Sequence, residues 1–363
     1  MKIVQIINEV RRGGGAEALL FTFSEEASAH DIDCSLVSLR EAESSYAEQI
    51  SSLGVPVVSI AARKLINPWR FFKLVRYLKS VQADLVHTHL TSANILGVLA
   101  ARLLNIPSVV SLHNVKMVSL QHPYHGKLEC WLLKHWAGHI VAVGDNTEVA
   151  HRPLLGDAPM TVIPNAVNPP PSLGAEDRKK LRQELFPDFN GLIIMTVGRL
   201  HEQKGYDRLL QALSQLTEDY RCIIVGDGEL RDMLTSLSCD LGLQAKVSFL
   251  GIRQDIGPLL SASDLYVSSS LWEGLPVATL EAMYARLPIV ATRVGDVGII
   301  LENDAGVLVE PDDVDALAGA LDELLGSAEK RAGYGDRAFN KVDADYNAGR
   351  WMQRLKSIYQ TLL

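Results

Sequence analysis

Short apolar segments rich in β-branched residues recur along the chain and alternate with stretches of helical periodicity. In the first half these segments are 2–7, 34–39, 57–60, 84–87, 108–112 and 140–143. They are mostly apolar throughout, which is typical of strands covered on both faces. The pattern therefore predicts a parallel sheet flanked by helices.

The strand pattern restarts after a proline-rich break at 168–172. The later candidate strands are 192–197, 222–225, 246–250, 264–268, 289–292 and 306–309. We expect an α/β protein with two Rossmann-like doubly wound domains, 1–168 and 169–346, that face a cleft. Ligands of such sheets lie beyond the carboxyl ends of the strands, so function should be sought in the strand-to-helix loops.

Composition excludes several classes of protein. With 363 residues, 47% of them hydrophobic, the chain can bury a large core. Its four cysteines stand far apart with no C-x-x-C spacing, which indicates neither zinc nor a disulfide framework and fits a reducing cytoplasm. The start of the chain predicts a strand and no signal peptide, and the longest apolar run, 93–104, is too short to span a bilayer. A net charge of −8 argues against nucleic-acid binding.

The first strand-to-helix loop contains Gly13, Gly14 and Gly15. Glycines let backbone amides approach a ligand closely, and the following helix directs free N–H groups to the same place, so an anion would fit. Gly13, Gly15 and Ala18 also satisfy a loose dinucleotide fingerprint, with Glu41 at about the right distance. Residues 10–12 lengthen that turn beyond the fingerprint. A nicotinamide site and a flexible turn without ligand remain as alternatives.

Two cations flank the first loop of the second domain. Arg199 lies just past the strand 192–197, and Lys204 lies where the next helix should begin. A guanidinium fork and a compact ammonium can together stabilise a departing diphosphate, as a divalent metal does elsewhere. The alternative is a pair of ordinary surface cations near a turn.

The segment 268–282 follows another strand and is the most informative. It bends at Gly274 and should begin a helix at about Pro276, which leaves the first helical amides unpaired. Glu273 lies in the loop and Glu281 lies farther along the helix, so their carboxylates can reach different parts of one extended ligand rich in hydroxyl groups. The alternative is that both acids only stabilise the helix N-terminal half.

These segments carry a family resemblance. Glu273 and Glu281 form an E-x7-E pattern, and the pattern resembles that of the retaining glycosyltransferases of family 4, which have the GT-B fold. Further motifs similar to that family are Gly-Gly-Ala-Glu at 14–17, His-Thr-His at 87–89, Ile-Pro-Asn-Ala at 163–166, Val-Gly-Arg at 197–199, Lys-Gly at 204–205, Gly-Asp-Gly-Glu-Leu at 226–230 and Phe-Leu-Gly at 249–251. The resemblance spans nearly the whole chain.

The resemblance implies a role for each matching position. Glu281 would bind the donor ribose, Glu273 the transferred sugar, and Arg199 with Lys204 the diphosphate. Other implied donor-binding positions are Gly14 and Gly15 from the first domain, the amides of Gly274, Leu275, Val277 and Ala278 for phosphate, and Gly251 with Ile252 for the base. In this fold the terminal helix 347–363 packs back on the first domain.

Histidines and Glu17 complete the implied site. His113 fits the place of a histidine that contacts the donor hexose, and His87, His89 and Glu17 fall on the acceptor side. The alternative for each histidine is a structural, internally satisfied residue. The implied reaction moves a hexose from a UDP- or GDP-sugar to a glycan, glycolipid or lipid-linked acceptor in cell-envelope synthesis, with retained anomeric configuration and no metal or other cofactor.

Three D-x-D strings, at 31–33, 313–315 and 343–345, match the motif of metal-dependent transferases. Their contexts are the turn before a strand, the start of a helix after Pro311, and a C-terminal linker. None of these falls in the expected cleft, so we predict no metal site.

The acceptor substrate is the part of the function that the sequence determines least. Residues 63–82 contain no acid and several aromatic residues, together with six cations, Arg63, Lys64, Arg70, Lys73, Arg76 and Lys79. A basic amphipathic helix can lie on an anionic membrane leaflet, which would suit a lipid-linked acceptor. The alternative is a surface helix with its aromatic face in the core.

Two other functional classes share this architecture. A sugar-nucleotide epimerase has the same two-domain fold without an acceptor, and a bilobed sugar-binding protein has the cleft without chemistry. The motifs disfavour both.

Overall fold

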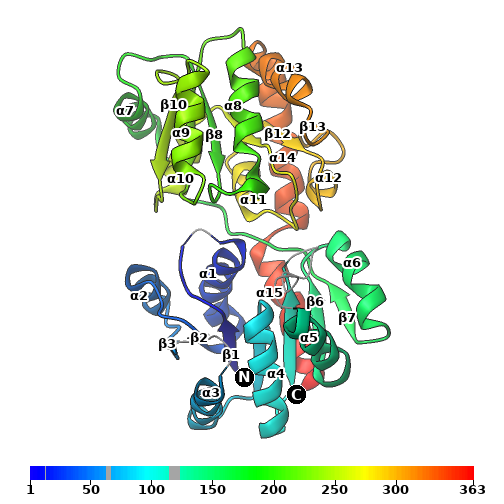
Figure 1. The fold of residues 1–363 in the computed structure, drawn as a ribbon. Helices are drawn as coiled ribbons and strands as arrows, with labels where there is room; N and C mark the ends of the chain where they lie inside the picture. Colours follow the sequence, from blue (N-terminus) through cyan, green and yellow to red (C-terminus); the bar gives the residue numbers. More distant parts are fainter. Residues whose placement is uncertain (13, 63–66, 114–122) are drawn as a thin grey trace. The chain divides into compact units, whose positions relative to one another are not determined.

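The computed structural model describes residues 1–12, 14–62, 67–113 and 123–363. Gly13 and the cations Arg63 and Lys64, which the sequence analysis included, lie outside the described residues. The chain divides into two compact units (Figure 1). Unit 1 comprises Met1–Ala166 with Ala348–Leu363, and unit 2 comprises Val167–Asn347.

Unit 1 is built on a seven-stranded parallel sheet, as the apolar segments predict. Its strands, in spatial order, are β3 (Val57–Ser59), β2 (Asp33–Ser38), β1 (Lys2–Ile7), β4 (Leu85–His89), β5 (Ser108–Leu112), β6 (His139–Ala142) and β7 (Met160–Val162). The sequence did not predict β7, which has only three residues. Strand order reverses between β1 and β4, and such a switch point is where ligands of open α/β sheets bind.

Helices cover both faces of this sheet. They are α1 (Gly15–Ala27), α2 (Ser44–Ser52), α3 (Pro68–Ser80), α4 (Thr91–Leu104), α5 (Pro123–Trp136), α6 (Asp145–Leu155) and α15 (Ala348–Leu362). The terminal α15 packs beside α1, with Trp351 and Tyr359 in the same core cluster as Leu19 (Figure 1). Helices α3, α4 and α5 pack side by side on the other face.

Alternation along β1 and β4 determines which side chains lie on each face of the sheet. Ile3 and Ile7 point to the α1 and α15 side, and Val4 and Ile6 to the α3 and α4 side. Because successive side chains of a strand alternate, Gln5 shares the face of Ile3 and Ile7. By the same rule, the two histidines of β4 share the face of Leu85.

Unit 2 holds a six-stranded parallel sheet. Its strands, in spatial order, are β10 (Val247–Gly251), β9 (Tyr220–Val225), β8 (Leu192–Val197), β11 (Leu265–Ser268), β12 (Ile289–Thr292) and β13 (Val307–Val309). Its helices are α7 (Ala175–Leu185), α8 (Tyr206–Gln215), α9 (Arg231–Asp240), α10 (Ile256–Ala262), α11 (Val277–Tyr284), α12 (Val297–Ile300), α13 (Val314–Leu325) and α14 (Ala328–Asp345). The switch point here lies between β8 and β11.

One expected context for a D-x-D string is wrong. Asp343 and Asp345 belong to α14 and not to a linker, because the helical spacing of buried Ala338 and Val342 carries the helix to its end. Asp313 caps α13 as expected, since its carboxylate accepts a 2.9 Å hydrogen bond from the Ala316 amide. No group of histidine, cysteine or carboxylate side chains suited to a metal occurs among the described residues.

Candidate active site

The position of Arg199 is fixed by two loops of unit 2 whose backbones contact each other directly. The Gly198 amide donates to Val225 O at 2.9 Å, and the Leu200 amide donates to Asp227 O at 3.0 Å. A Cβ on Gly226, whose φ is +135°, would collide with Gly198 O, so the close approach requires glycine. The side chain of Arg199 is exposed, and in the described part of the chain it has no ion pair or hydrogen bond.

Lys204 does not stand free beside Arg199. Its Nζ lies 2.5 Å from Glu273 Oε1, and the Glu273 side chain is only 7% exposed. Ser270 Oγ donates to the same oxygen at 2.7 Å, and Gln203 Nε2 donates to Oε2 at 3.2 Å. Three donors thus hold one ionised carboxylate, which is how proteins satisfy a buried charge.

The loops that carry Lys204 and Glu273 are tied together at the switch point of unit 2. Ser269 Oγ donates to Lys204 O at 2.8 Å, and the Leu271 amide donates to Gln203 O at 2.7 Å. Gly205 adopts the left-handed region with φ +58°, and a Cβ there would collide with Ser269 O. The ion pair therefore rests on a rigid backbone frame.

The N-terminus of α11 lies in the same segment. The helix begins at Val277, directly after Pro276, so its start agrees with the prediction. The amides of Val277 and Ala278 are first-turn groups that the helix itself does not bond. Upstream, Gly274 O accepts a 3.0 Å bond from the Asp296 amide, which fixes the bend. Together these features form a frame suited to a phosphate.

Glu281 lies on α11 and is half-buried. Burial raises the pKa of its carboxyl group to about 7. Burial, followed by the influence of Tyr206, Glu281 and Glu273, also raises the pKa of Tyr266 well above its usual value.

Gly251 ends the edge strand β10, and Ile252 follows it directly. Gly251 has φ +67°, and its carbonyl accepts a 2.8 Å bond from the Gly226 amide. Gly226 is the residue that packs on the Arg199 loop, so the two expected donor positions are joined through it. Ile252 is 62% exposed, an unusual state for a large apolar side chain.

In unit 1, the glycine loop leads into α1 as predicted. Gly14 is the N-cap residue and Gly15 the first helical residue. Glu17 lies in the first turn, and its carboxylate fills the space that a Cβ on Gly14 would need. Its carbonyl accepts a 3.0 Å bond from Tyr46 Oη.

Three histidines gather at the switch point of unit 1. His89 Nδ1 lies 2.8 Å from His113 Nε2, and His89 Nε2 lies 2.7 Å from Gln5 Oε1. His87 Nδ1 lies 2.6 Å from Tyr359 Oη, and its Nε2 lies 2.8 Å from Ser111 Oγ. The His87 and His89 rings are 4.5 Å apart.

All three rings are held neutral. Burial, and secondarily His113, lowers the pKa of His87 to about 3. Burial lowers the pKa of His113 to about 4, and burial with the two neighbouring rings lowers that of His89 well below its usual value. His87 and His89 are buried and both nitrogens of each are engaged by side chains.

Several partners of these residues were not singled out from the sequence. They are Gln5, Ser111, Tyr359, Gln203 and Ser270. Gln5 did carry a signal, because it is the one uncharged polar residue within the apolar strand Lys2–Ile7. The others follow from strand register and loop packing, which a single sequence does not reveal.

The basic helix differs from its expected form. Arg70 is fully buried, because its guanidinium donates to Ile60 O at 2.9 Å and Ala62 O at 2.7 Å. The aromatic residues divide between core and surface, since Phe71 and Tyr77 pack against the core cluster. Trp69 is 67% and Phe72 61% exposed. Lys73, Arg76 and Lys79 are exposed on the same helix. No helix among the described residues is long and apolar enough to cross a membrane.

Comparison with known proteins identifies the family. Residues 13–169 match the model of Glycosyltransferase Family 4, and residues 177–341 match that of the glycosyl transferases group 1. The chain is 31% identical over 307 residues to the UDP-Gal:alpha-D-GlcNAc-diphosphoundecaprenol alpha-1,3-galactosyltransferase of Escherichia coli, covering 79% of this chain and 77% of that protein. It is 30% identical over 279 residues to the 2-deoxystreptamine glucosyltransferase of Streptomyces kanamyceticus, covering 69% and 72%.

Solved structures agree on the fold. The structure of Anabaena Alr3699/HepE in complex with UDP-glucose superposes with a TM-score of 0.88 at 23% identity, over the full length of both chains. The lipopolysaccharide glycosyltransferase WaaG gives 0.79 at 16% identity. Neither the epimerase nor the binding-protein alternative is favoured by these relatives. The chain is an enzyme of two Rossmann-like domains that belongs to the family 4 glycosyltransferases, the glycosyl transferases group 1.

Proposed function

We propose that this glycosyltransferase transfers a hexose from a UDP-sugar, with unit 2 as the donor-binding domain and unit 1 as the acceptor-side domain. The observation that carries the proposal is the frame around Lys204 and Glu273 at the switch point of unit 2, with exposed Arg199 and the N-terminus of α11 in the adjoining loops. The Escherichia coli relative, by its name, uses UDP-Gal.

The leaving group is stabilised by unit 2. Arg199 and Lys204 bind the diphosphate, and the amides of Gly274, Leu275, Val277 and Ala278 donate to its oxygens. As the bond between the anomeric carbon and phosphate oxygen breaks, negative charge grows on that oxygen, and preorganised cations and amides stabilise it. The acceptor hydroxyl oxygen bonds to the same face of the anomeric carbon, and its proton passes to the departing phosphate oxygen. The products are the glycoside with retained configuration and the free nucleoside diphosphate.

The remaining residues bind and orient the donor. Glu281 accepts hydrogen bonds from the ribose hydroxyls, Glu273 positions the hexose, and Gly251 with Ile252 receives the base. Gly14 and Gly15 serve the donor from unit 1, and His113 contacts the hexose. No metal enters the reaction, because the cations and helix amides neutralise the diphosphate charge.

The acceptor belongs to the class of glycans, glycolipids and lipid-linked saccharides of cell-envelope synthesis. The relative from Escherichia coli is named for a diphosphoundecaprenol-linked acceptor. Glu17 lies on this side. His87 and His89 support the acceptor side from within the core and do not touch the acceptor, because all four of their nitrogens bond to protein.

We also propose contact with an anionic membrane at its cytoplasmic face, and the surface of α3 supports this proposal. Exposed Trp69 and Phe72 adjoin Lys73, whose Nζ lies 5.8 Å from the Trp69 ring centre. Helix α5, which packs against α4 as α3 does, adds exposed Trp131 and Trp136, whose ring centres lie 4.9 Å apart. Aromatic side chains among cations suit the interface of an anionic bilayer.

A thermal-shift panel tests the donor assignment. The parent protein is melted with UDP, GDP, ADP and NAD, and with UDP-glucose, UDP-galactose and GDP-mannose. UDP and at least one UDP-hexose should raise the melting temperature, because a ligand that binds only the folded state stabilises it by mass action. Stabilisation by NAD or GDP alone would overturn the UDP assignment.

Vesicle sedimentation tests the membrane assignment. The protein should sediment with vesicles containing phosphatidylglycerol, and the triple variant Lys73→Glu, Arg76→Glu, Lys79→Glu should lose most of this binding. Arg70 is left unchanged because its guanidinium is part of the core. The control reverses Lys179 and Lys180, exposed on α7 of unit 2. Failure of the parent protein to bind these vesicles would rule the contact out.

A further inference from the structure

The geometry points to Gln5 and His89 as positioning residues that fix the tautomer of His113, so that His113 Nδ1 is a hydrogen-bond acceptor for a hydroxyl of the donor hexose. This inference rests on the proposed contact between His113 and that hexose. It adds two residues behind the site, one of which lies on β1 and the other on β4, across the switch point of unit 1.

The argument begins at Gln5, which is fully buried. Its Oε1 faces His89 Nε2 at 2.7 Å, and an amide oxygen can only accept, so His89 Nε2 carries the hydrogen. A neutral imidazole has one N–H group, so His89 Nδ1 is an acceptor. The partner of that atom at 2.8 Å is His113 Nε2, which must therefore donate. His113 Nδ1 then carries a lone pair and no hydrogen.

The relay works only with neutral rings. A protonated imidazole donates from both nitrogens, so a second proton on His89 would remove the acceptor between the two rings, and a second proton on His113 would remove the acceptor at its Nδ1. Burial lowers the pKa of His113 to about 4 and that of His89 well below its usual value, so both rings are neutral at physiological pH. The direction of the relay then depends on the orientation of the Gln5 amide. With Gln5 Nε2 toward His89, every bond would reverse and His113 Nδ1 would carry the hydrogen.

The neighbouring His87 is not fixed in this way. Its partners are the hydroxyls of Tyr359 and Ser111, and a hydroxyl can rotate to donate or accept. His87 therefore provides an internal contrast, because it is equally buried but joined to partners that impose no tautomer. Removing Ser111 Oγ should leave the relay through Gln5 and His89 intact.

An acceptor at His113 has a consequence for substrate choice. It takes a hydrogen bond from a sugar hydroxyl, whereas a fluorine in the same position cannot donate one. Sites built to bond a substrate hydroxyl discriminate against analogues that lack it, because the protein group is left unpaired.

The test begins with nitrogen-15 NMR of the parent protein labelled at histidine, with the His113 signals assigned by their loss in His113→Asn. We expect His113 to be the Nε2–H tautomer at neutral pH. A His113 proton on Nδ1 in the parent protein would overturn the inference.

Variants then test the role in binding. Gln5→Leu removes the acceptor and should yield a mixture of His113 tautomers. Its affinity for the UDP-hexose that stabilises the parent should fall about tenfold, the size of one hydrogen bond, while its affinity for UDP stays unchanged. Ser111→Ala should change neither value.

The outcomes separate this inference from the proposed function. If no UDP-hexose binds the parent protein while His113 is the Nε2–H tautomer, the donor assignment fails and the relay geometry stands. If the parent binds a UDP-hexose and Gln5→Leu binds it equally well, the positioning role fails while the donor assignment stands.

Discussion

The strand order reverses in the same way in the two sheets, but the side chains at the two switch points differ in charge. In unit 2, the loops after β8 and β11 bring together a buried carboxylate, its lysine partner and an exposed arginine. In unit 1, the corresponding strands β1 and β4 bring together a glutamine and histidines that burial keeps neutral. One edge presents charge, and the other presents neutral hydrogen-bonding groups.

This difference matches what each edge is proposed to bind. A diphosphate carries charge that grows as it departs, so fixed cations and helix amides stabilise it. A hexose is neutral, and neutral imidazoles can bond its hydroxyls without the cost of a buried charge. The same scaffold thus places the leaving-group cations in unit 2 and a neutral sugar contact at His113 in unit 1, in addition to the sugar contact at Glu273. The cations and the neutral contact can each be disturbed alone.

The largest effect is expected from removing cations in unit 2. Arg199→Ala and Lys204→Ala should each lower kcat about 100- to 1000-fold, because preorganised charge on the leaving group is lost in the transition state. Steady-state kinetics with the UDP-hexose measure this. Arg199→Ala is the cleaner variant, since within the described residues its side chain has no partner to disturb. Lys204→Ala also leaves the Glu273 carboxylate buried without its cation.

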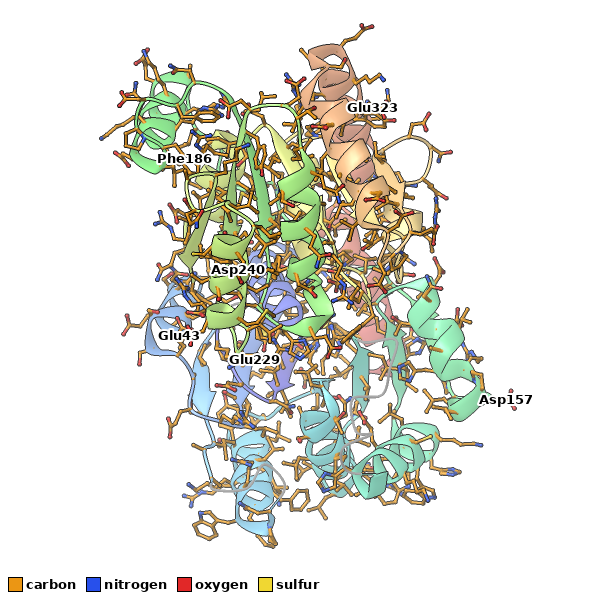
Figure 2. All side chains as sticks on the ribbon, turned by 45° about the horizontal axis from the view of Figure 1, so that its top comes forward. Glu43, Asp157, Phe186, Glu229, Asp240 and Glu323 are labelled. Carbon is orange, nitrogen blue, oxygen red and sulfur yellow. The ribbon has the colours of Figure 1, made fainter. Side chains whose placement is uncertain are left out.

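A matched control removes an ion pair of the same unit away from these loops. Lys330 pairs with Glu323 at 2.6 Å. Figure 2 shows Glu323 and Glu229, the latter in the loop that packs beside Arg199, at opposite ends of unit 2. Lys330→Ala should keep full turnover. Near-normal turnover in Arg199→Ala and Lys204→Ala would remove the basis for a charged site in unit 2.

A smaller loss is expected from Glu273→Gln. The glutamine oxygen can still accept from Ser270 and Lys204, so the hexose remains positioned and kcat should fall about ten- to 100-fold. A covalent nucleophile could not be replaced in this way. Loss of all measurable activity, with melting behaviour unchanged, would show that Glu273 reacts with the sugar.

The sequence could predict the fold but only part of the site. Uniformly apolar strands and the break at 168–172 were enough for two parallel sheets, because burial on both faces leaves a direct mark on composition. Arg199 and Glu273 could be singled out as candidates because each stands in a recognisable loop, and their roles stay predictions. The ion pair of Lys204 with Glu273 was not, since it depends on how two loops 69 residues apart pack together. Likewise the burial of Arg70 cannot be predicted from the sequence, because nothing local shows that carbonyls of the preceding segment surround its guanidinium.

Glu281 gives a pH-dependent prediction for unit 2. Its carboxyl pKa is raised to about 7 by burial, and ribose hydroxyls bond more strongly to the ionised form than to the protonated form. UDP affinity should therefore fall as the pH drops below 7, by up to about tenfold per pH unit, until the pKa of the bound state is reached. Calorimetric titrations of the parent and Glu281→Gln measure this. The dependence of UDP affinity on pH should be weaker in the variant than in the parent. An identical dependence in both proteins would contradict the ribose role of Glu281.

The contribution of Glu281 to folding stability changes with pH in the opposite sense to its contribution to UDP affinity. Because the folded pKa of Glu281 lies above its usual value of 4.5, folding favours the protonated carboxyl. That contribution is fully present below the unfolded pKa and is lost as the pH rises through 7. Glu281→Gln should therefore melt a few degrees higher than the parent at about pH 8 and at nearly the same temperature at about pH 5. The buried histidines of unit 1 contribute the opposite trend, because burial holds their folded pKa values below the unfolded value of 6.5 and stability is therefore lost as the pH falls below about 6.5. That trend is common to the parent and Glu281→Gln, so it cancels in their comparison.

The smallest effect is expected from chelation. If Arg199, Lys204 and the α11 amides carry the whole charge of the diphosphate, excess EDTA should leave the rate of transfer unchanged, and added magnesium or manganese should not raise it. Loss of transfer with EDTA and its recovery with either metal would show that the cations of unit 2 are insufficient.

The same reaction mixture reports the stereochemistry by proton NMR of the early product. Retention is expected, because the phosphate oxygen that takes the acceptor proton lies on the face from which the acceptor attacks. Inversion would require a base on the opposite face, and the neutral His113 of unit 1 would then have to act as that base despite a pKa of about 4.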